Sequence, residues 1–118
     1  MPYIGIDLLK KMTSDEWYSR CCITGERPVQ LHHAINFGSR SINEPFAIVP
    51  LSKKVHDMVT PHNPAYDKEM EEKVMLIALN RATDAEIRSI SKVYNYFNLR
   101  QRLQEKYRDF AVKSDGRK

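Results

Sequence analysis

The chain has 118 residues, of which 42% are hydrophobic and 29% charged, and its formal net charge is +4. This length suits one domain with a single core, and these proportions exclude a disordered or membrane-embedded class. No apolar run approaches the roughly 20 residues that span a bilayer, and the first residues do not resemble a secretory signal. We therefore expect a cytoplasmic protein with no membrane partner, and the positive charge favours a polyanionic partner.

The N-terminal region predicts short helical elements. Residues 3–12 favour a short helix or an irregular arm, and Thr13 with Glu16 forms a capping-box pattern that predicts a second short helix. Trp17, the single tryptophan, is expected to pack in the core.

Two adjacent cysteines follow. An intrachain disulfide between Cys21 and Cys22 would be badly strained, so both are expected to be free thiols. Residues 22–25 resemble half of a zinc knuckle in which threonine replaces the second cysteine, and no later cysteine pair could complete four sulfur ligands. A structural zinc is therefore not expected.

All histidines of the chain gather in one segment. Histidine is the commonest metal ligand among side chains and titrates near neutrality, so this segment is the candidate functional site. Alternating apolar and polar residues predict a strand whose end carries two histidines facing opposite sides. Ser52 is the expected N-cap of a helix that Pro61 ends. The four histidines are His32, His33, His56 and His62. The expected order is a strand at 29–32, a loop at 34–45, a strand at 46–51 and a helix from 53 to about 59.

The C-terminal half predicts helices that support this segment. Apolar residues at spacings of three and four predict a helix over 67–80, and a second capping box at Thr83 and Glu86 opens a long helix. The first stripe of the long helix is expected to be core. The second stripe is rotated, so this helix either bends near 95–98 or packs on two neighbours, and the second stripe could also form a dimer seam. The first stripe is Ile87, Ile90, Tyr94 and Phe97, and the second is Leu99, Leu103, Tyr107 and Phe110.

The expected fold class is α+β, a small ββα-metal hairpin–helix core supported by an N-terminal helix and two C-terminal helices. We expect one domain over residues 1–112, in which 22–63 form the core and 64–112 the helical support. Residues 113–118 are expected to form a disordered basic tail.

Two adjacent histidines can serve two roles in such a core. If the hairpin delivers His32 and His33 while the following helix presents His56, one of the pair can share a divalent ion with His56. The other, which faces a different way, is then free to take a proton.

At this point the residues match a known family. The stretch CCITGERPVQLHHAINFGSR, followed by IVPLSKKVH, resembles the HNH, or ββα-metal (His-Me finger), endonucleases. It looks most like the phage nucleases of the recombination-enhancement type, which also lack the four-cysteine zinc. The resemblance implies that His32 is a metal ligand, His33 the general base that activates water, and His56 a second ligand.

The sequence departs from the family at two positions. The asparagine of the family falls at Ala47, so Asn43 or Asn36 is expected to brace the hairpin and orient the base. The frequent third ligand falls at Thr60, a poor ligand, and His62 is the obvious alternative, with Asn63 a weaker one. With two protein ligands, the resemblance implies a hydrated Mg²⁺ or Mn²⁺ rather than a tightly held Zn²⁺.

Three basic residues are candidates for contacts with nucleic acid. Arg40 is either a phosphate clamp that assists catalysis or an exposed loop cation, and Lys53 with Lys54 could meet the backbone from the helix start.

Two functions remain open. The first is a metal-dependent DNA endonuclease, inside a bacterial host if phage-encoded, directed by a recruiting protein and acting as a monomer or homodimer, with RNA as an alternative substrate. The second is a catalytically silent, metal-stapled module that binds nucleic acid or protein.

Overall fold

The computed structural model describes residues 5–37 and 40–110, and the side chains of 37, 40 and 41 lie outside that description. The basic tail expected at 113–118 also lies outside the described residues. Within them the fold is α+β, as predicted. A two-stranded antiparallel sheet is preceded and followed in the sequence by helices.

The N-terminal elements are α1, Ile6–Thr13, and a 3-10 turn, Glu16–Ser19. The capping box expected at Thr13 is wrong. Thr13 ends α1, and its hydroxyl donates to the Lys10 carbonyl. Asp15 caps the turn instead by accepting from the Trp17 N–H at 3.0 Å, because this carboxylate lies one residue before the turn and is as good a cap as threonine.

Trp17 is only partly buried. It packs against the core and stacks under the guanidinium group of Arg81, whose carbon lies 3.5 Å from the ring centre. The tryptophan therefore joins the N-terminal turn to the central helix at the edge of the core, rather than filling its interior.

The hairpin consists of β1, Gln30–His33, paired antiparallel with β4, Ile48–Leu51. His32 lies opposite Val49 and His33 opposite Ile48, and every residue of β4 is buried. The predicted strands are confirmed with shifts of one or two residues. The intervening segment was expected to be a loop, but it contains a second small hairpin, whose strands are too short to give an alternating pattern. This hairpin pairs β2, Asn36–Phe37, with β3, Arg40–Ser41, and a 3-10 turn, Pro45–Ala47, follows.

Helix α2, Lys53–Met58, follows β4 directly. Its predicted N-cap is confirmed, since the Ser52 side chain accepts from the Val55 N–H at 3.4 Å. Val55 is 2% exposed and anchors the helix in the core. This anchoring fixes the direction in which His56, the next residue, leaves the helix.

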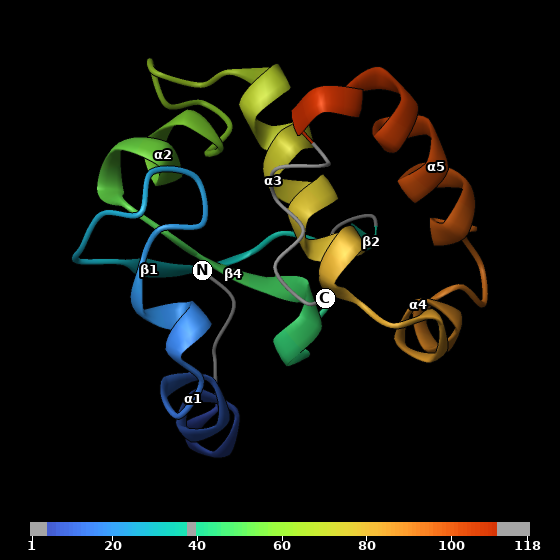
Figure 1. The fold of residues 1–118 in the computed structure, drawn as a ribbon, viewed down its shortest axis with the longest axis horizontal. Helices are drawn as coiled ribbons and strands as arrows, with labels where there is room; N and C mark the ends of the chain where they lie inside the picture. The colour runs from blue at the N-terminus through green and yellow to red at the C-terminus, as the bar shows by residue number, and fades with distance from the viewer. Residues whose placement is uncertain (1–4, 38–39, 111–118) are drawn as a thin grey trace.

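Helix α3, Lys68–Arg81, runs through the middle of the molecule, with α2 on one side and α5 on the other (Figure 1). Asp67 caps it, accepting from the N–H groups of Glu69 and Met70. Its core-facing residues are Val74, Leu76, Ile77, Ala78 and Leu79, all buried. This helix is the element against which both the hairpin and the C-terminal helices pack.

The predicted long C-terminal helix is two helices: a single continuous helix is wrong, and the chain breaks at 91–95, just before the bend that was one of the two alternatives. Helix α4, Asp84–Ile90, begins with the expected capping box of Thr83 and Glu86. Helix α5, Tyr96–Lys106, begins after a break and is capped by Asn95. The Ser91 hydroxyl donates to the Ile87 carbonyl and accepts from the Tyr96 N–H, so it satisfies backbone groups on both sides of the break.

The break changes which side chains are core. Ile87 and Tyr96 are buried, but Tyr94 is 40% exposed because it lies between the two helices. The second stripe folds back on the protein's own core: Leu103 is 4% exposed, and its companions pack against the same cluster. These residues therefore do not form a free seam on the described surface.

Polar pairs fasten α5 to the rest of the fold. Lys106 Nζ lies 2.8 Å from the Glu72 carboxylate on α3. The Tyr96 hydroxyl donates to the Asn36 carbonyl at 2.7 Å, which joins α5 to the small β2–β3 hairpin beside the histidines.

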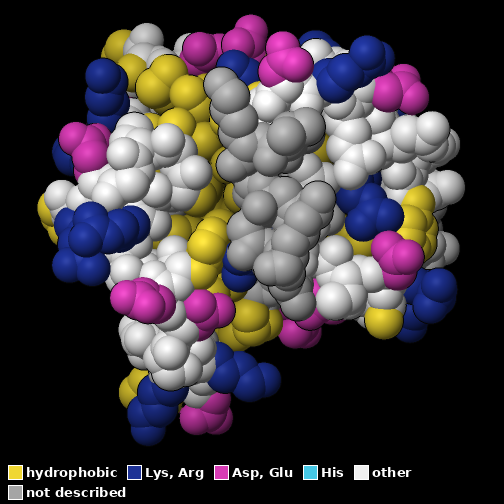
Figure 2. All heavy atoms as spheres, in the orientation of Figure 1, with side chains coloured by type: hydrophobic (Ala, Val, Ile, Leu, Met, Phe, Trp, Pro, Cys, Tyr) yellow, Lys and Arg dark blue, Asp and Glu magenta, His cyan; other side chains and the backbone are white. Residues whose placement is uncertain are grey.

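Basic and acidic side chains are interspersed over the face in Figure 2 rather than gathered in a patch of one sign. Among the described helices, none is long and apolar enough to cross a membrane.

Candidate functional site

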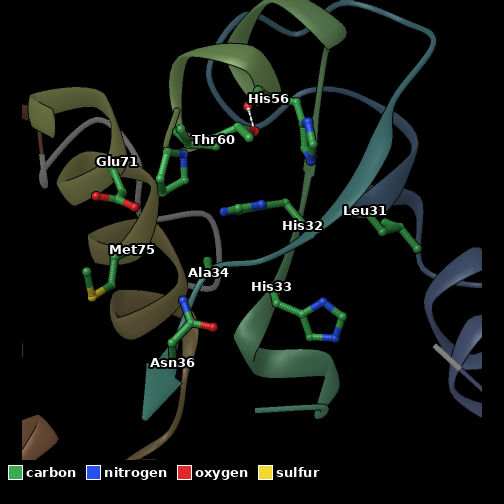
Figure 3. A pocket seen from close by; sticks show the side chains of 11 residues that line it. Leu31, His32, His33, Ala34, Asn36, His56, Thr60, Glu71 and Met75 are labelled. Atoms are coloured by element: carbon green, nitrogen blue, oxygen red, sulfur yellow. Dashed lines mark hydrogen bonds between the residues drawn. The ribbon is translucent and has the colours of Figure 1, made fainter. Parts of the chain in front are cut away.

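The histidine-bearing elements meet around a pocket of about 260 Å³ between β1, α2 and α3. His32 reaches it from β1 and His56 from α2, while His33 lines it from β1 with its ring turned to the other side of the strand (Figure 3). The remaining lining residues are Leu31, Ala34, Asn36, Val59, Thr60, Pro61, Glu71 and Met75. The rings of His32 and His56 therefore share one cavity, although more than twenty residues separate them in the chain.

The rings of His32 and His56 face each other in this pocket. Their centres are 5.4 Å apart and their planes are nearly perpendicular, at 88° (Figure 3). Two imidazoles that bind one ion through nitrogens about 2 Å away from it would have ring centres roughly 5 Å apart. The spacing of this pair therefore fits a shared divalent ion.

The electrostatics of His32 also suit a ligand. Burial of the ring lowers the pKa of His32 to about 4, with smaller contributions from the charges that His56 and His33 can carry. At neutral pH His32 is thus uncharged and keeps a nitrogen lone pair, the form in which imidazole binds metals.

The third protein ligand expected from the sequence does not join this pair. His62 does not line the pocket; it is exposed and has a backbone φ of 73° in the turn after α2. Within the described residues, no three His, Cys, Asp or Glu side chains form a group able to hold an ion. Thr60 is engaged elsewhere, since its hydroxyl donates to the His56 carbonyl at 2.6 Å. An ion bound here would take its other ligands from water, as hydrated Mg²⁺ and Mn²⁺ do.

His33 leaves β1 on the opposite side from His32, as the alternation along a strand predicts (Figure 3). The His33 side chain is 7% exposed, and its Nε2 lies 3.0 Å from the amide oxygen of Asn43. Because an amide oxygen only accepts, this contact requires a hydrogen on Nε2, and the neutral form of the ring then has its lone pair on Nδ1. Asn43 therefore holds His33 in the tautomer and orientation that a proton acceptor needs.

This contact answers the question raised by Ala47. Ala47 is completely buried, and its carbonyl accepts from the Ala34 N–H at 2.8 Å, which closes the base of the loop. Of the two asparagines considered as a brace, Asn43 contacts His33. Asn36 lines the pocket and gives its backbone carbonyl to Tyr96.

The predicted basic contacts differ in their surroundings. Lys53 pairs with Asp57 on the next turn of α2 at 3.0 Å, with 78% of its side chain exposed, while Lys54 is exposed beside it. The backbone of Arg40 belongs to β3, but its side chain lies outside the described part of the chain.

One pocket residue was not expected from the sequence. Glu71 of α3 lies across the pocket from the histidines and accepts a hydrogen bond from the Tyr66 hydroxyl (Figure 3). In the sequence it was one of several acidic residues near the start of a helix, where the helix dipole is a sufficient explanation. The sequence does not indicate which face of this helix turns toward the hairpin, so it does not predict that Glu71 lines the pocket.

Comparison with known proteins finds no family model, no curated protein and no solved structure that matches this chain. The functional interpretation therefore depends on the residues of the chain and on their geometry.

Proposed function

We propose that this protein is a metal-dependent endonuclease of the HNH type that hydrolyses phosphodiester bonds in DNA. One observation carries the proposal: the His32 and His56 rings meet 5.4 Å apart while His33, the next residue, is held by Asn43 on the other side of the strand. A ligand pair and an oriented, unliganded imidazole at the end of one β-hairpin are the components that this chemistry requires.

His32 and His56 would hold Mg²⁺ or Mn²⁺ in preference to Zn²⁺, with water completing the coordination. When bound, such an ion supplies positive charge that stabilises the negative charge building on the phosphate and on the departing oxygen. Both imidazoles bind through neutral nitrogens, and the low pKa of His32 keeps that ring available well below neutral pH.

His33 acts as the general base. Its Nδ1 lone pair accepts a proton from a water molecule as the water oxygen bonds to phosphorus. The bond from phosphorus to the 3′ oxygen then breaks, and that oxygen takes a proton from solvent, which leaves a 5′ phosphate and a 3′ hydroxyl. Attack and departure occur on opposite sides of phosphorus.

Contacts to the rest of the DNA would come from Lys53 and Lys54 at the start of α2, and from Arg40. These side chains offer charge rather than a pattern of donors and acceptors for base edges, so we expect weak sequence preference. RNA as a substrate, recruitment by a partner protein and action as a monomer or a homodimer are open parts of the same proposal.

A second function has its own support. The alternative is a catalytically silent module in which a metal ion staples α2 to the hairpin for nucleic-acid or protein binding. The low exposure of His33, 7%, favours it, because a base must reach its water.

Incubation of supercoiled plasmid with purified protein and Mg²⁺, Mn²⁺ or Zn²⁺ tests the proposal. His33→Ala should slow cleavage about 10²–10⁴-fold, the usual contribution of a general base. Gln101→Ala, an exposed change on α5, is the matched control and should cleave as the parent does.

Equal cleavage by the parent and His33→Ala in every metal would contradict the nuclease proposal. If no protein cleaves and a chelator lowers the melting temperature of the parent, the stapled module is the correct function.

A further inference from the structure

A second cavity, of about 320 Å³, lies between α1, the 3-10 turn after it and β1. Its apolar lining comes from Met12, Val29 and Leu31, and its polar lining from Thr13, Asp15, Tyr18 and Ser19. This volume falls at the lower end of the range for small-molecule sites, about 300–1,000 Å³. The cavity therefore has room for one small ring system in contact with apolar side chains.

The polar residues around this cavity offer hydrogen-bond acceptors. The hydroxyls of Thr13 and Ser19 donate their single hydrogens to the backbone carbonyls of Lys10 and Glu16. A hydroxyl that has given its hydrogen to the backbone can still accept through its oxygen.

Asp15 also offers a hydrogen-bond acceptor to this cavity. One carboxylate oxygen accepts from the Trp17 N–H at 3.0 Å, and the other has no donor among the described residues. An ionised carboxylate can only accept, so this cavity favours a ligand that brings N–H or O–H donors.

The cavity is a neighbour of the proposed site. Leu31 lines both cavities, and its side chain leaves β1 on the same side as His33 (Figure 3). Two residues along a strand span roughly 6.6 Å, so a group held at Leu31 lies beside the imidazole of His33. A nucleobase and the phosphate of the same nucleotide can span such a separation.

We propose that this cavity receives one unpaired nucleobase carrying an exocyclic amino group, from the nucleic-acid strand whose phosphate lies at His33. Adenine, cytosine and guanine carry an amino group with two N–H donors, whereas the one donor of an unpaired thymine base, N3–H, lies between two carbonyl oxygens that would face the acceptors of the cavity. In a duplex these amino groups are occupied by pairing, so the base must come from a single strand or be turned out of the helix. The inference rests on the proposed nuclease function and specifies its substrate as a strand with an unpaired base.

Methyl NMR with free nucleosides tests the cavity without any cleavage. Deoxycytidine and deoxyadenosine should shift the methyl signals of Leu31 and Val29, while thymidine and deoxyribose 5-phosphate should shift them much less. Thr13→Phe, which fills the cavity from an exposed position, should lose most of the shift. Ser89→Phe on α4 is the matched control, because Ser89 is also exposed, also bonds to a carbonyl three residues earlier, and does not line the cavity. It should keep the full shift.

The outcomes separate the two proposals. If the nucleosides leave both methyl signals unchanged while plasmid is cut in a His33-dependent way, the base pocket is wrong and the nuclease stands. Equal shifts with thymidine and deoxycytidine would also overturn the inference. Selective shifts in a protein that cuts no plasmid would support the pocket and remove the nuclease.

Discussion

The two sides of β1 give neighbouring histidines opposite surroundings. On one side His32 meets a second imidazole, His56, in a pocket closed by α2 and α3. On the other side His33 meets the amide of Asn43, and Leu31, two residues earlier on that side, lines the cavity between β1 and α1. The first arrangement gathers lone pairs for a cation, and the second fixes a tautomer. A step of one residue along a strand is enough to separate a ligand from a base, because successive side chains face opposite sides.

The largest effect is expected when the imidazole of His56, which faces His32, is removed. His56→Ala should reduce plasmid cleavage by about 10³-fold or more, because an ion that stabilises developing charge contributes several kcal/mol. The same change should abolish the rise in melting temperature that Mn²⁺ produces in the parent, since an ion that binds the folded chain stabilises it. His62→Asn should keep that rise, because His62 lies outside the pocket. A normal response to Mn²⁺ in His56→Ala would exclude this pair as the metal site.

In metal-free protein, acid should lower the free energy of unfolding through the titration of His32. The pKa of His32 is about 4 in the folded chain and about 6.5 when unfolded. Above pH 6.5 both states are neutral. Between pH 6.5 and 4 only the unfolded chain takes up this proton, so the free energy of unfolding falls by about 2–3 kcal/mol, and below pH 4 this loss stops.

Urea unfolding of the parent and of His32→Gln at pH 7 and pH 4 measures this contribution. The parent should lose about 2–3 kcal/mol more than the variant across that interval. His62→Asn, at an exposed position, should follow the parent. Identical losses in the parent and His32→Gln would show that burial of His32 has no effect on its titration.

On the other side of β1, a substitution of Asn43 removes its contact with His33 and leaves the histidine itself unchanged. Asn43→Ala should lower kcat about 10–100-fold, as loss of a group that orients an imidazole does, with KM and Mn²⁺ affinity unchanged. Asn43→Asp keeps an oxygen that accepts from Nε2 and should recover part of the rate. A change in KM alone would mean that Asn43 acts in binding and does not position His33.

The smallest effects are expected at the start of α2. Lys53→Ala should change stability by less than about 0.5 kcal/mol, since its pair with Asp57 is exposed. Lys54→Ala should weaken DNA binding a few-fold without changing the cleavage rate at saturating DNA, measured by fluorescence anisotropy at two salt concentrations. An effect of Lys54→Ala that did not decline with salt would argue against a phosphate contact.

The hairpin–helix core was predictable because its signals are local. Ser52 caps the helix that presents His56, and alternation along the strand separates His32 from His33. These features depend on residues within a few positions of each other. The strand limits shifted by one or two residues, as element ends usually do.

The missed features depend on contacts between distant segments. The break at 91–95 forms because Ser91 satisfies backbone groups on both sides, and this competes with an apolar spacing that suits one helix. Selection of Asn43 over Asn36 required the path of the loop, which includes a hairpin too short to leave a pattern. Glu71 reaches the pocket through the packing of α3, which periodicity alone does not determine.

The bond from the Tyr96 hydroxyl to the Asn36 carbonyl spans sixty positions of the chain. During synthesis on the ribosome, the histidine-bearing segment emerges well before Tyr96, the first residue of α5, has been made. Until then the backbone beside the histidines lacks this anchor, and the apolar surface of α3 that α5 covers is open to water. A nascent chain is therefore incompletely assembled around its histidines until α5 has left the ribosome.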